Sequence, residues 1–259
     1  MDLGIDGRKA MVCASSQGLG LACATSLARE GCAVFINGRD ESRLAEAVAQ
    51  IEAATDVRAT PVVADINTEQ GRTALIAACP DVDILVNNNA GPPPGELADW
   101  DHAAWLAALE ANMLAPILLI RALLPGMRQR RFGRIVNITS AMVKSPRAHM
   151  GLSTAARTGL TALCKALVPE VAKDNVTINN LLPERIDTGR QRFMTERMMR
   201  MENISFEEAR ARITDTIAAK RFGKPEEFGD ACAFLCSEQA GFISGQNLQL
   251  DGGSYRGLI

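Results

Sequence analysis

Short apolar segments alternate with segments of helical length along this whole chain. Seven segments have the length and composition of buried strands: Lys9–Cys13, Ala33–Asn37, Thr60–Ala64, Ile84–Asn87, Arg134–Thr139, Val176–Leu182 and Asn247–Leu250. Amphipathic stretches between them predict helices over Leu19–Glu30, Glu41–Ala54, Trp105–Arg128 and Thr154–Lys173. Connections of this length favour right-handed crossovers and a parallel sheet. We therefore expect an α/β fold, in which residues 1–259 form a single Rossmann-like domain with a doubly wound parallel sheet of about seven strands and helices on both faces.

Composition excludes several classes of protein. The net charge of -2 gives no electrostatic basis for binding nucleic acid or an anionic membrane. No uninterrupted apolar run reaches the length of a membrane span, and the N-terminus lacks the pattern of a signal peptide. The seven cysteines contain no Cys-x-x-Cys pair, and His102 and His149 are the only histidines. We expect small buried thiols, no metal site and a cytoplasmic location.

A glycine-rich turn follows the first strand and opens a helix. Such a turn lets backbone N–H groups and the helix N-terminus meet a pyrophosphate, and a side chain at Gly18 or Gly20 would block that approach. Ala14 stands where a first glycine is usual. The residues expected to hold a dinucleotide here are Ala14, Ser15, Ser16, Gln17, Gly18, Leu19 and Gly20.

The end of the second strand bears on the choice between NADP(H) and NAD(H). A carboxylate closing this strand would bind a ribose hydroxyl and select NAD(H), but Gly38 occupies that place and Arg39 follows. Because a guanidinium suits a phosphate, we expect NADP(H), with NAD(H) less favoured. In the alternative, Arg39 projects into solvent and Asp40 turns towards the ribose. Asp65 and Ile66, which end the third strand, are placed to contact the adenine.

Further motifs follow in register along the whole chain, and together they make it similar to the short-chain dehydrogenase/reductase family. They are Asp83–Ala90, Leu109–Asn112, Gly133–Ser140, Asn179–Thr188, Gly223–Glu227, Ile243–Gln246 and Asp251–Gly253. The run Gly91–Gly95 resembles a divergent branch similar to 3-oxoacyl carrier-protein reductases. An ungapped alignment, preferred because an insertion would disrupt a buried strand, places Asn88, Asn89 and Ala90 on the family's second asparagine, alanine and glycine, which implies that they bind the cofactor. The alternative aligns 89–91 and needs an insertion.

In that family a serine holds the substrate oxygen, an asparagine holds a relay water, and a tyrosine and a lysine complete the site. The resemblance places Ser140 on the serine and Asn112 on the asparagine. It places Ser153 where the tyrosine is usual and Arg157 where the lysine is usual, and Tyr255 is the only tyrosine. It also implies that Arg157 binds the cofactor and that Pro183, Ile186 and Thr188 line its nicotinamide end.

The source of the proton stays open. A serine hydroxyl is a weaker acid and is shorter than a phenol, and a guanidinium cannot relay a proton. A water held by Ser140 and Ser153 is one route. His149 is another, because imidazole exchanges protons near neutral pH. Lys144, Glu184 and, from a neighbouring subunit, Tyr255 are further alternatives.

These observations predict an NADP(H)-dependent oxidoreductase that transfers hydride to or from a small carbonyl or alcohol substrate. The methionine- and arginine-rich segment 189–215 is expected to cover the substrate as an apolar lid. The alternative is a dinucleotide-binding protein with little redox activity that acts as a sensor or partner subunit. Halohydrin dehalogenases share the arginine but keep the tyrosine and lack the glycine-rich loop, which is the opposite pattern. The family resemblance also implies a homodimer or homotetramer.

Overall fold

The computed structural model describes residues 2–258, whose strands form one parallel sheet in the order β3-β2-β1-β4-β5-β6-β7. The predicted fold class is confirmed. The order reverses at β1, which lies between β2 and β4, and such a switch point is where open α/β sheets bind ligands. The strands are β1 (Lys9–Val12), β2 (Ala33–Gly38), β3 (Thr60–Val63), β4 (Ile84–Asn87), β5 (Gly133–Ile138), β6 (Val176–Pro183) and β7 (Asn247–Leu250).

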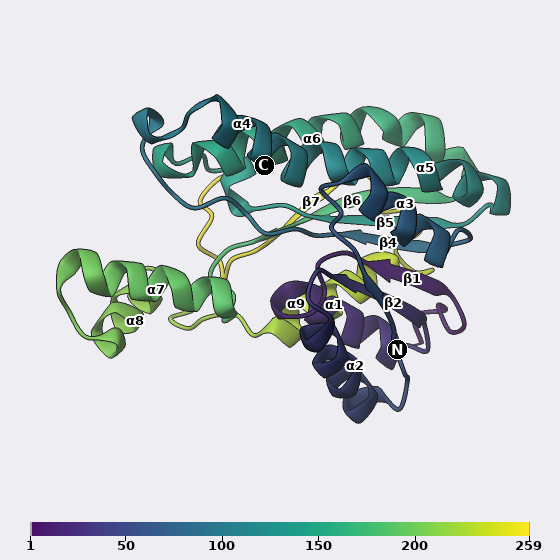
Figure 1. Ribbon diagram of the computed structural model, residues 1–259, viewed down its shortest axis with the longest axis horizontal. Helices are drawn as coiled ribbons and strands as arrows, with labels where there is room; N and C mark the ends of the chain where they lie inside the picture. Colours follow the sequence, from purple (N-terminus) through teal and green to yellow (C-terminus); the bar gives the residue numbers. More distant parts are fainter. Residues whose placement is uncertain (1, 259) are drawn as a thin grey trace.

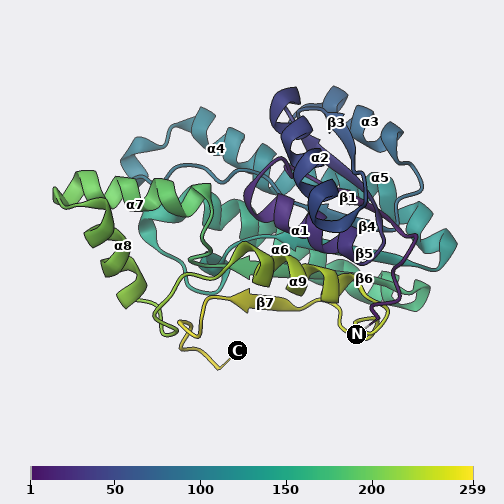
Figure 2. The same ribbon diagram turned by 90° about the horizontal axis from the view of Figure 1, so that it is seen from below.

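Helices cover both faces of this sheet (Figure 1). One layer contains α1 (Gly18–Arg29), α2 (Glu41–Thr55) and α9 (Pro225–Cys236). The other contains α3 (Glu69–Ala78), α4 (His102–Leu109), α5 (Ala115–Arg130) and α6 (Gly151–Val171). The hairpin of α7 (Gly189–Glu202) and α8 (Phe206–Asp215) extends away from both layers, as Figures 1 and 2 show. It is built from the methionine- and arginine-rich segment.

The helix predicted over Trp105–Arg128 is interrupted. A π-helical turn at Glu110–Leu114 separates α4 from α5. Such single turns are frequent at functional sites, because they redirect the side chains on the helix. Helical periodicity in the sequence is nearly the same on both sides of the turn, which is why the interruption could not be predicted.

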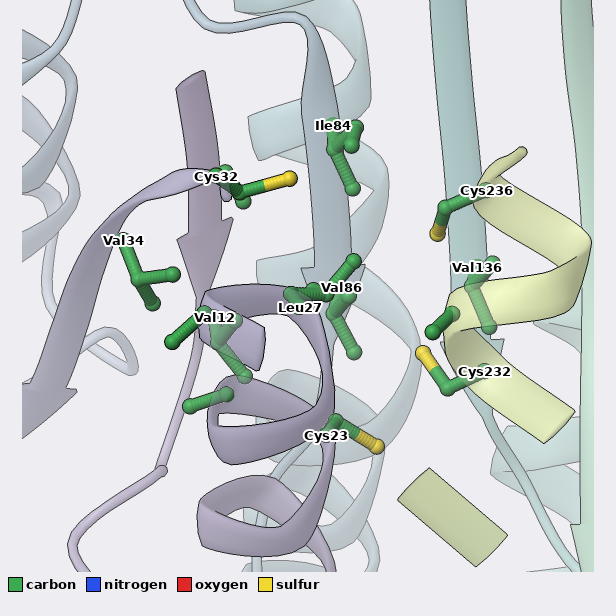
Figure 3. Close-up of a cluster of buried hydrophobic side chains, with 14 of the residues drawn as sticks. Val12, Cys23, Leu27, Cys32, Val34, Ile84, Val86, Val136, Cys232 and Cys236 are labelled. Atoms are coloured by element: carbon green, nitrogen blue, oxygen red, sulfur yellow. The ribbon is translucent and has the colours of Figure 1, made fainter. Parts of the chain in front are cut away.

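Two apolar cores lie between the sheet and its helix layers. One joins β1, β2 and β4 to α1, α2 and α9, and the other joins β4, β5 and β6 to α3, α5 and α6. Figure 3 shows thiols of the first core, with Cys23 on α1 facing Cys232 on α9. All seven cysteines are free and buried, which confirms the expectation of small buried thiols. Packing of α1 against α9 fixes the start of α1, where the glycine-rich turn lies.

A row of four asparagines crosses the sheet inside the second half of the fold. The Nδ2 of Asn87 donates to Oδ1 of Asn137 (2.9 Å), Asn137 donates to Asn180 (2.9 Å), and Asn180 donates to Asn247 (2.8 Å). The four residues are direct cross-strand partners on β4, β5, β6 and β7. Because each buried amide has its partner on the next strand, the row fixes the register of the strand ends that carry the site.

The helical run His102–Arg130 meets the length and composition criteria for crossing a membrane, with about one third of its apolar window buried. Counting uninterrupted apolar runs in the sequence missed it, because isolated polar residues break the run without lowering its average hydropathy. Leu119, Ile120, Leu123 and Met127 from this helix pack in the second core. The exposed remainder, which includes Leu106 and Leu114, is an apolar face without cover in a single chain.

The asparagine row yields a test of stability. Replacing Asn137 with alanine leaves the Asn87 amide and the Asn180 carbonyl oxygen without their partners. We expect the free energy of unfolding to fall by about 2–5 kcal/mol, since each buried group left unpaired costs about 1–3 kcal/mol. Asn247→Ala, at the less buried end of the row, should cost clearly less. Chemical denaturation of the two variants measures the difference, and equal losses would contradict a role for the row in fixing the register.

Candidate functional site

A cleft of about 610 Å³ opens at the carboxyl ends of the strands. The loops after β1 to β6 all contribute to its lining, because the ends of parallel strands meet at one edge of the sheet. The cleft spans the switch point between β1 and β4. Most residues that the sequence analysis assigned to a dinucleotide line it: Ala14, Ser16, Gln17, Gly18, Leu19, Arg39, Asp65, Ile66, Asn88, Asn89, Ala90, Arg157, Pro183, Ile186 and Thr188.

The glycine-rich turn depends on close backbone approach. Gly18 has φ +60°, which favours glycine, and a Cβ on Gly20 would lie 2.5 Å from the Ala14 carbonyl oxygen. Ala14 itself has φ +43°, so the replacement of the usual glycine there carries backbone strain. Ser15 and Gly20 do not line the cleft. The Ser15 hydroxyl instead donates to the Val12 carbonyl oxygen (2.7 Å) and accepts from the backbone N–H of Asn37 (3.0 Å). It therefore stabilises the turn on the side away from the cleft.

The end of the cleft that follows β2 and β3 holds two arginines and two carboxylates. Arg39 is largely exposed, and its guanidinium lies 3.8 Å from the Asp65 carboxylate. Asp40 caps α2, because its carboxylate accepts from the Arg43 backbone N–H (3.1 Å), and it also lies near the Arg43 side chain. The Asp40 carboxylate is thus already engaged on its own helix. The Arg39 guanidinium, with its side chain 72% exposed, is accessible from the cleft.

The segment after β4 is held by its asparagine side chains. Asn88 donates to the Ala14 carbonyl (3.0 Å), and Asn89 donates to Asn67 (2.8 Å) and to the Ala111 carbonyl (3.0 Å). The strand itself ends at Asn87. An inserted residue at positions 88–91 would therefore lie in the loop, so strand disruption does not decide between the two alignments of this motif.

At the other end of the cleft, Ser140, Ser153 and Arg157 lie together. The Arg157 Nε donates to the Ser153 hydroxyl oxygen (3.2 Å), and its NH1 group donates to the carbonyl oxygens of Ile138 (2.6 Å) and Thr139 (2.7 Å). Ser140 accepts from the Met142 backbone N–H (3.2 Å). Both serine oxygens thus accept from a fixed N–H. The hydroxyl proton of each serine can therefore be donated to another acceptor.

Arg157 carries its charge in a buried place. It is 7% exposed, and its hydrogen bonds go to carbonyl and hydroxyl oxygens instead of a carboxylate. Burial, with a smaller effect from the nearby positive charge of Arg190, lowers the pKa of Arg157 to about 10. The guanidinium therefore still carries its charge at neutral pH, at the base of the cleft.

Asn112 lies behind the cleft and not on its wall. It sits in the π turn and donates to the Ala90 carbonyl (3.3 Å). A small cavity of about 10 Å³ lies between Asn112 and Arg157. This volume has room for about one water molecule. Asn87, Asn88 and Asn89 also line this cavity, and the Asn87 Oδ1 atom is buried without a partner among the described residues.

The alternative proton donors lie outside the main cleft. His149 is half-buried in a short 3₁₀ turn, Ala148–Met150, and only its neighbour Met150 lines the cleft. The Lys144 ammonium lies over the Tyr255 ring, and Glu184 accepts from Arg147 (2.9 Å). Glu184 and Tyr255 line a separate cavity of about 490 Å³.

Several lining residues were not singled out from the sequence. They include Arg185, Arg190, Gln191 and Phe193, which join Pro183, Ile186 and Thr188 at the wall formed after β6. The arginine-rich composition of 189–215 signalled the lid residues only as a group. Arg185 has φ +59°, and nothing in the sequence indicates a left-handed arginine there. Among residues 2–258, no group of three or more histidine, cysteine or acidic side chains could hold a metal.

Comparison with known proteins assigns the family. The family described as Enoyl-(Acyl carrier protein) reductase matches residues 13–255. Dehydrogenase/reductase SDR family member 4 of Bos taurus is 34% identical over 96% of this chain and 88% of its own. The uncharacterized oxidoreductase YvaG of Bacillus subtilis (strain 168) is 32% identical, with both chains fully covered. L-sorbose reductase from Gluconobacter frateurii, in a crystal structure with NADPH and L-sorbose, superposes with a TM-score of 0.93 at 30% identity over the whole of both chains. This chain belongs to the short-chain dehydrogenase/reductase family.

Proposed function

We propose that this protein is an NADP(H)-dependent oxidoreductase that transfers hydride to or from a small carbonyl or alcohol substrate. In its site Ser140 takes the place of the family's serine, and Ser153 and Arg157 stand where the tyrosine and the lysine are usual. The observation that carries the proposal is the placement of two serine hydroxyls and one buried cation in the same cleft as the glycine-rich turn. Its relatives include a reductase with NADPH bound.

The cleft fits a dinucleotide phosphate. Gly18 leaves the cleft side of the turn without a side chain, and a Cβ at Gly20, behind the turn, would collide with the backbone that shapes it. Arg39 lies at the end of β2 with much of its guanidinium in solvent, where charge-assisted hydrogen bonds to a ribose phosphate are available. Asp65 and Ile66 line the neighbouring wall, where we place the adenine.

The bound cofactor would supply the hydride, and the chain must stabilise the oxygen of the substrate. Because the Ser140 and Ser153 oxygens already accept from Met142 N–H and from Arg157, their O–H groups can donate into the cleft. Donors fixed in this way stabilise an oxygen that gains negative charge, at no cost of reorganisation. The Arg157 cation adds favourable electrostatics and stays protonated throughout.

A water molecule is the proton donor that this geometry favours. The small cavity between Asn112 and Arg157 has room for one, with the unpaired Asn87 Oδ1 as an acceptor in its wall. Ser140 and Ser153 would hold a second water beside the substrate oxygen. His149 stays a prediction that the geometry does not favour, because it lies outside the cleft lining.

We further propose that residues 1–259 act as one domain and that 189–215 form the substrate lid. The seven strands share one sheet, and Arg190, Gln191 and Phe193 at the start of α7 line the cleft. Residues 1 and 259 lie outside the described part of the chain.

We also propose that the protein assembles as a homodimer or homotetramer. Leu106, Leu114 and Leu163 leave apolar surface exposed on the layer of α4, α5 and α6. Phe234 on α9 and Leu248 on the edge strand β7 are also exposed, and these two elements lie beside each other in Figure 2. Apolar side chains that gather in this way are typical of an interface between copies.

The first prediction concerns the cofactor. Arg39→Ala should weaken NADPH binding about ten- to a hundredfold and leave NADH binding unchanged, because charge-assisted hydrogen bonds contribute about 1.5–3 kcal/mol. Isothermal titration calorimetry measures both. Asp40→Ala is the matched control, which should lower stability by about 0.5–2 kcal/mol through loss of a helix cap without changing the preference for NADPH. A preference that followed Asp40 would overturn the assignment to NADP(H).

The second prediction concerns the chemistry. With a carbonyl compound that supports NADPH oxidation, Ser140→Ala and Ser153→Ala should each lower kcat about 10²–10³-fold, as loss of one oxyanion donor does. His149→Gln should leave kcat unchanged. If only His149→Gln removed activity, the water route would be wrong. If NADPH bound but no compound in a broad carbonyl panel were reduced, the protein would be assigned as a dinucleotide-binding sensor or partner subunit.

The third prediction concerns assembly. Light scattering after size-exclusion chromatography should give the mass of two or four chains. Leu163→Glu should shift the protein to smaller species, since a charge within an apolar interface has no partner. Leu97→Glu, at an exposed site on a short loop helix, should not. A monomeric wild-type protein at micromolar concentration would contradict the proposal.

A further inference from the structure

The backbone at Arg185 adopts a conformation that a long side chain rarely takes. Its φ of +59° lies in the left-handed region, which costs a non-glycine residue about 1–2 kcal/mol. Hydrogen bonds hold the segment on both sides. Glu184 N–H donates to the Leu250 carbonyl (3.0 Å), Gly223 N–H donates to the Arg185 carbonyl (3.0 Å), and Asp187 N–H donates to the Gly223 carbonyl (2.8 Å). Strain that the surroundings enforce in this way is a feature of functional positions.

The guanidinium of Arg185 has no partner in the part of the chain that the structure describes. Two other arginines nearby are engaged: the exposed Arg147 pairs with Glu184 (2.9 Å), and the buried Arg157 donates to carbonyl oxygens. Arg185 is half-buried, yet no carboxylate or carbonyl oxygen of residues 2–258 receives its N–H groups. Burial lowers the pKa of Arg185, although the Glu184 charge opposes this. A half-buried cation with unused donors has a free-energy cost that a bound anion would relieve.

The position of Arg185 joins the main cleft to its neighbour. Arg185 lines both the main cleft and the separate cavity of about 490 Å³. Pro183 and Ile186 beside it line the cleft, as do Ser140 and Ser153. The carboxylates that line the cleft, Asp40 and Asp65, lie at the adenine end. The substrate end is therefore cationic, with Arg157, Arg185 and Arg190 among the residues that line it.

Of these three cations, only Arg185 has all of its N–H donors available to a ligand. Arg157 donates to backbone carbonyl oxygens at the end of β5 and after β4, and Arg190 donates to the Pro92 carbonyl oxygen (3.0 Å). The planar fork of an arginine matches the two oxygens of a carboxylate. We propose that Arg185 binds the carboxylate of the substrate and that the substrate class is small oxo acids and the corresponding hydroxy acids. This inference rests on the proposed oxidoreductase function.

The chemistry of such a substrate balances without any further reactant. The carbonyl carbon receives hydride, two electrons and one proton nucleus, from NADPH, which becomes NADP⁺. The carbonyl oxygen, held by the serine hydroxyls, receives its proton from the water, which bulk solvent reprotonates, so that one NADPH and one solvent proton are consumed. The carboxylate is unchanged and stays on Arg185, so it positions the carbonyl without taking part in the reaction.

The test compares each acid with its uncharged partner. Pyruvate, acetoacetate and 2-oxoglutarate are assayed for NADPH oxidation beside their methyl esters. We expect kcat/KM to be at least about tenfold higher for the best acid than for its ester, since one charge-assisted pair contributes about this factor. Arg185→Met should remove this preference by raising KM for the acid, while activity on the ester is retained. Arg185→Lys should recover part of it. Arg256→Met is the matched control, because Arg256 lines only the separate cavity of about 490 Å³, and this variant should keep the preference for the acid.

A binding measurement separates failure of this inference from failure of the proposed function. Calorimetry on the protein loaded with NADPH is repeated with propionate and glutarate, which cannot be reduced, and with the matched amides. Binding of a carboxylate but not its amide, lost in Arg185→Met with NADPH affinity unchanged, supports the inference even if no compound turns over. Esters and acids used equally well, or carboxylate binding that persists in Arg185→Met, would overturn it and leave the oxidoreductase assignment standing.

Discussion

The guanidinium of Arg157 joins the parts of the molecule on which the site depends. It reaches from α6 to the carbonyl oxygens at the end of β5 and to the hydroxyl of Ser153, one helical turn away. A cation in this place needs neutral oxygens around it, and the strand ends provide them because their carbonyl groups have left the sheet ladder. The same charge then faces the cleft. A single buried interaction thus orders the strand ends and sets the electrostatic character of the substrate end.

The buried asparagines behind the cleft form a second polar arrangement next to this cation. The asparagine row fixes β4 to β7 against one another, and its first member presents an unpaired oxygen to the small cavity beside Asn112. The π turn gives Asn112 its place there, because an ordinary helix from α4 to α5 would rotate that side chain. Register, helix geometry and the space for one water molecule are therefore linked.

Sequence reasoning succeeded where chemistry depends on local order. The glycine-rich turn, the end of β2 and the strand ends follow one another directly along the chain, so periodicity and spacing located them. It was less successful where residues act through distant contacts. Ser15 supports the turn and does not line the cleft, and Glu184 turns away to Arg147. Arg185 gave no signal, because the feature that distinguishes it is a left-handed backbone that hydrogen bonds to β7 and Gly223 hold in place, and these contacts come from distant segments of the chain.

The sequence by itself determined the order of strands and helices, the glycine positions that admit a phosphate, and the identity of the side chains at residues 140, 153 and 157. These depend on residue type and on spacing within one strand–helix unit. Only the tertiary structure decided which oxygens the Arg157 cation meets, where the π turn falls, and which of many arginines keeps its donors free. Those outcomes depend on segments far apart in the chain, and the free energy of burying a charge is set by all of its neighbours together.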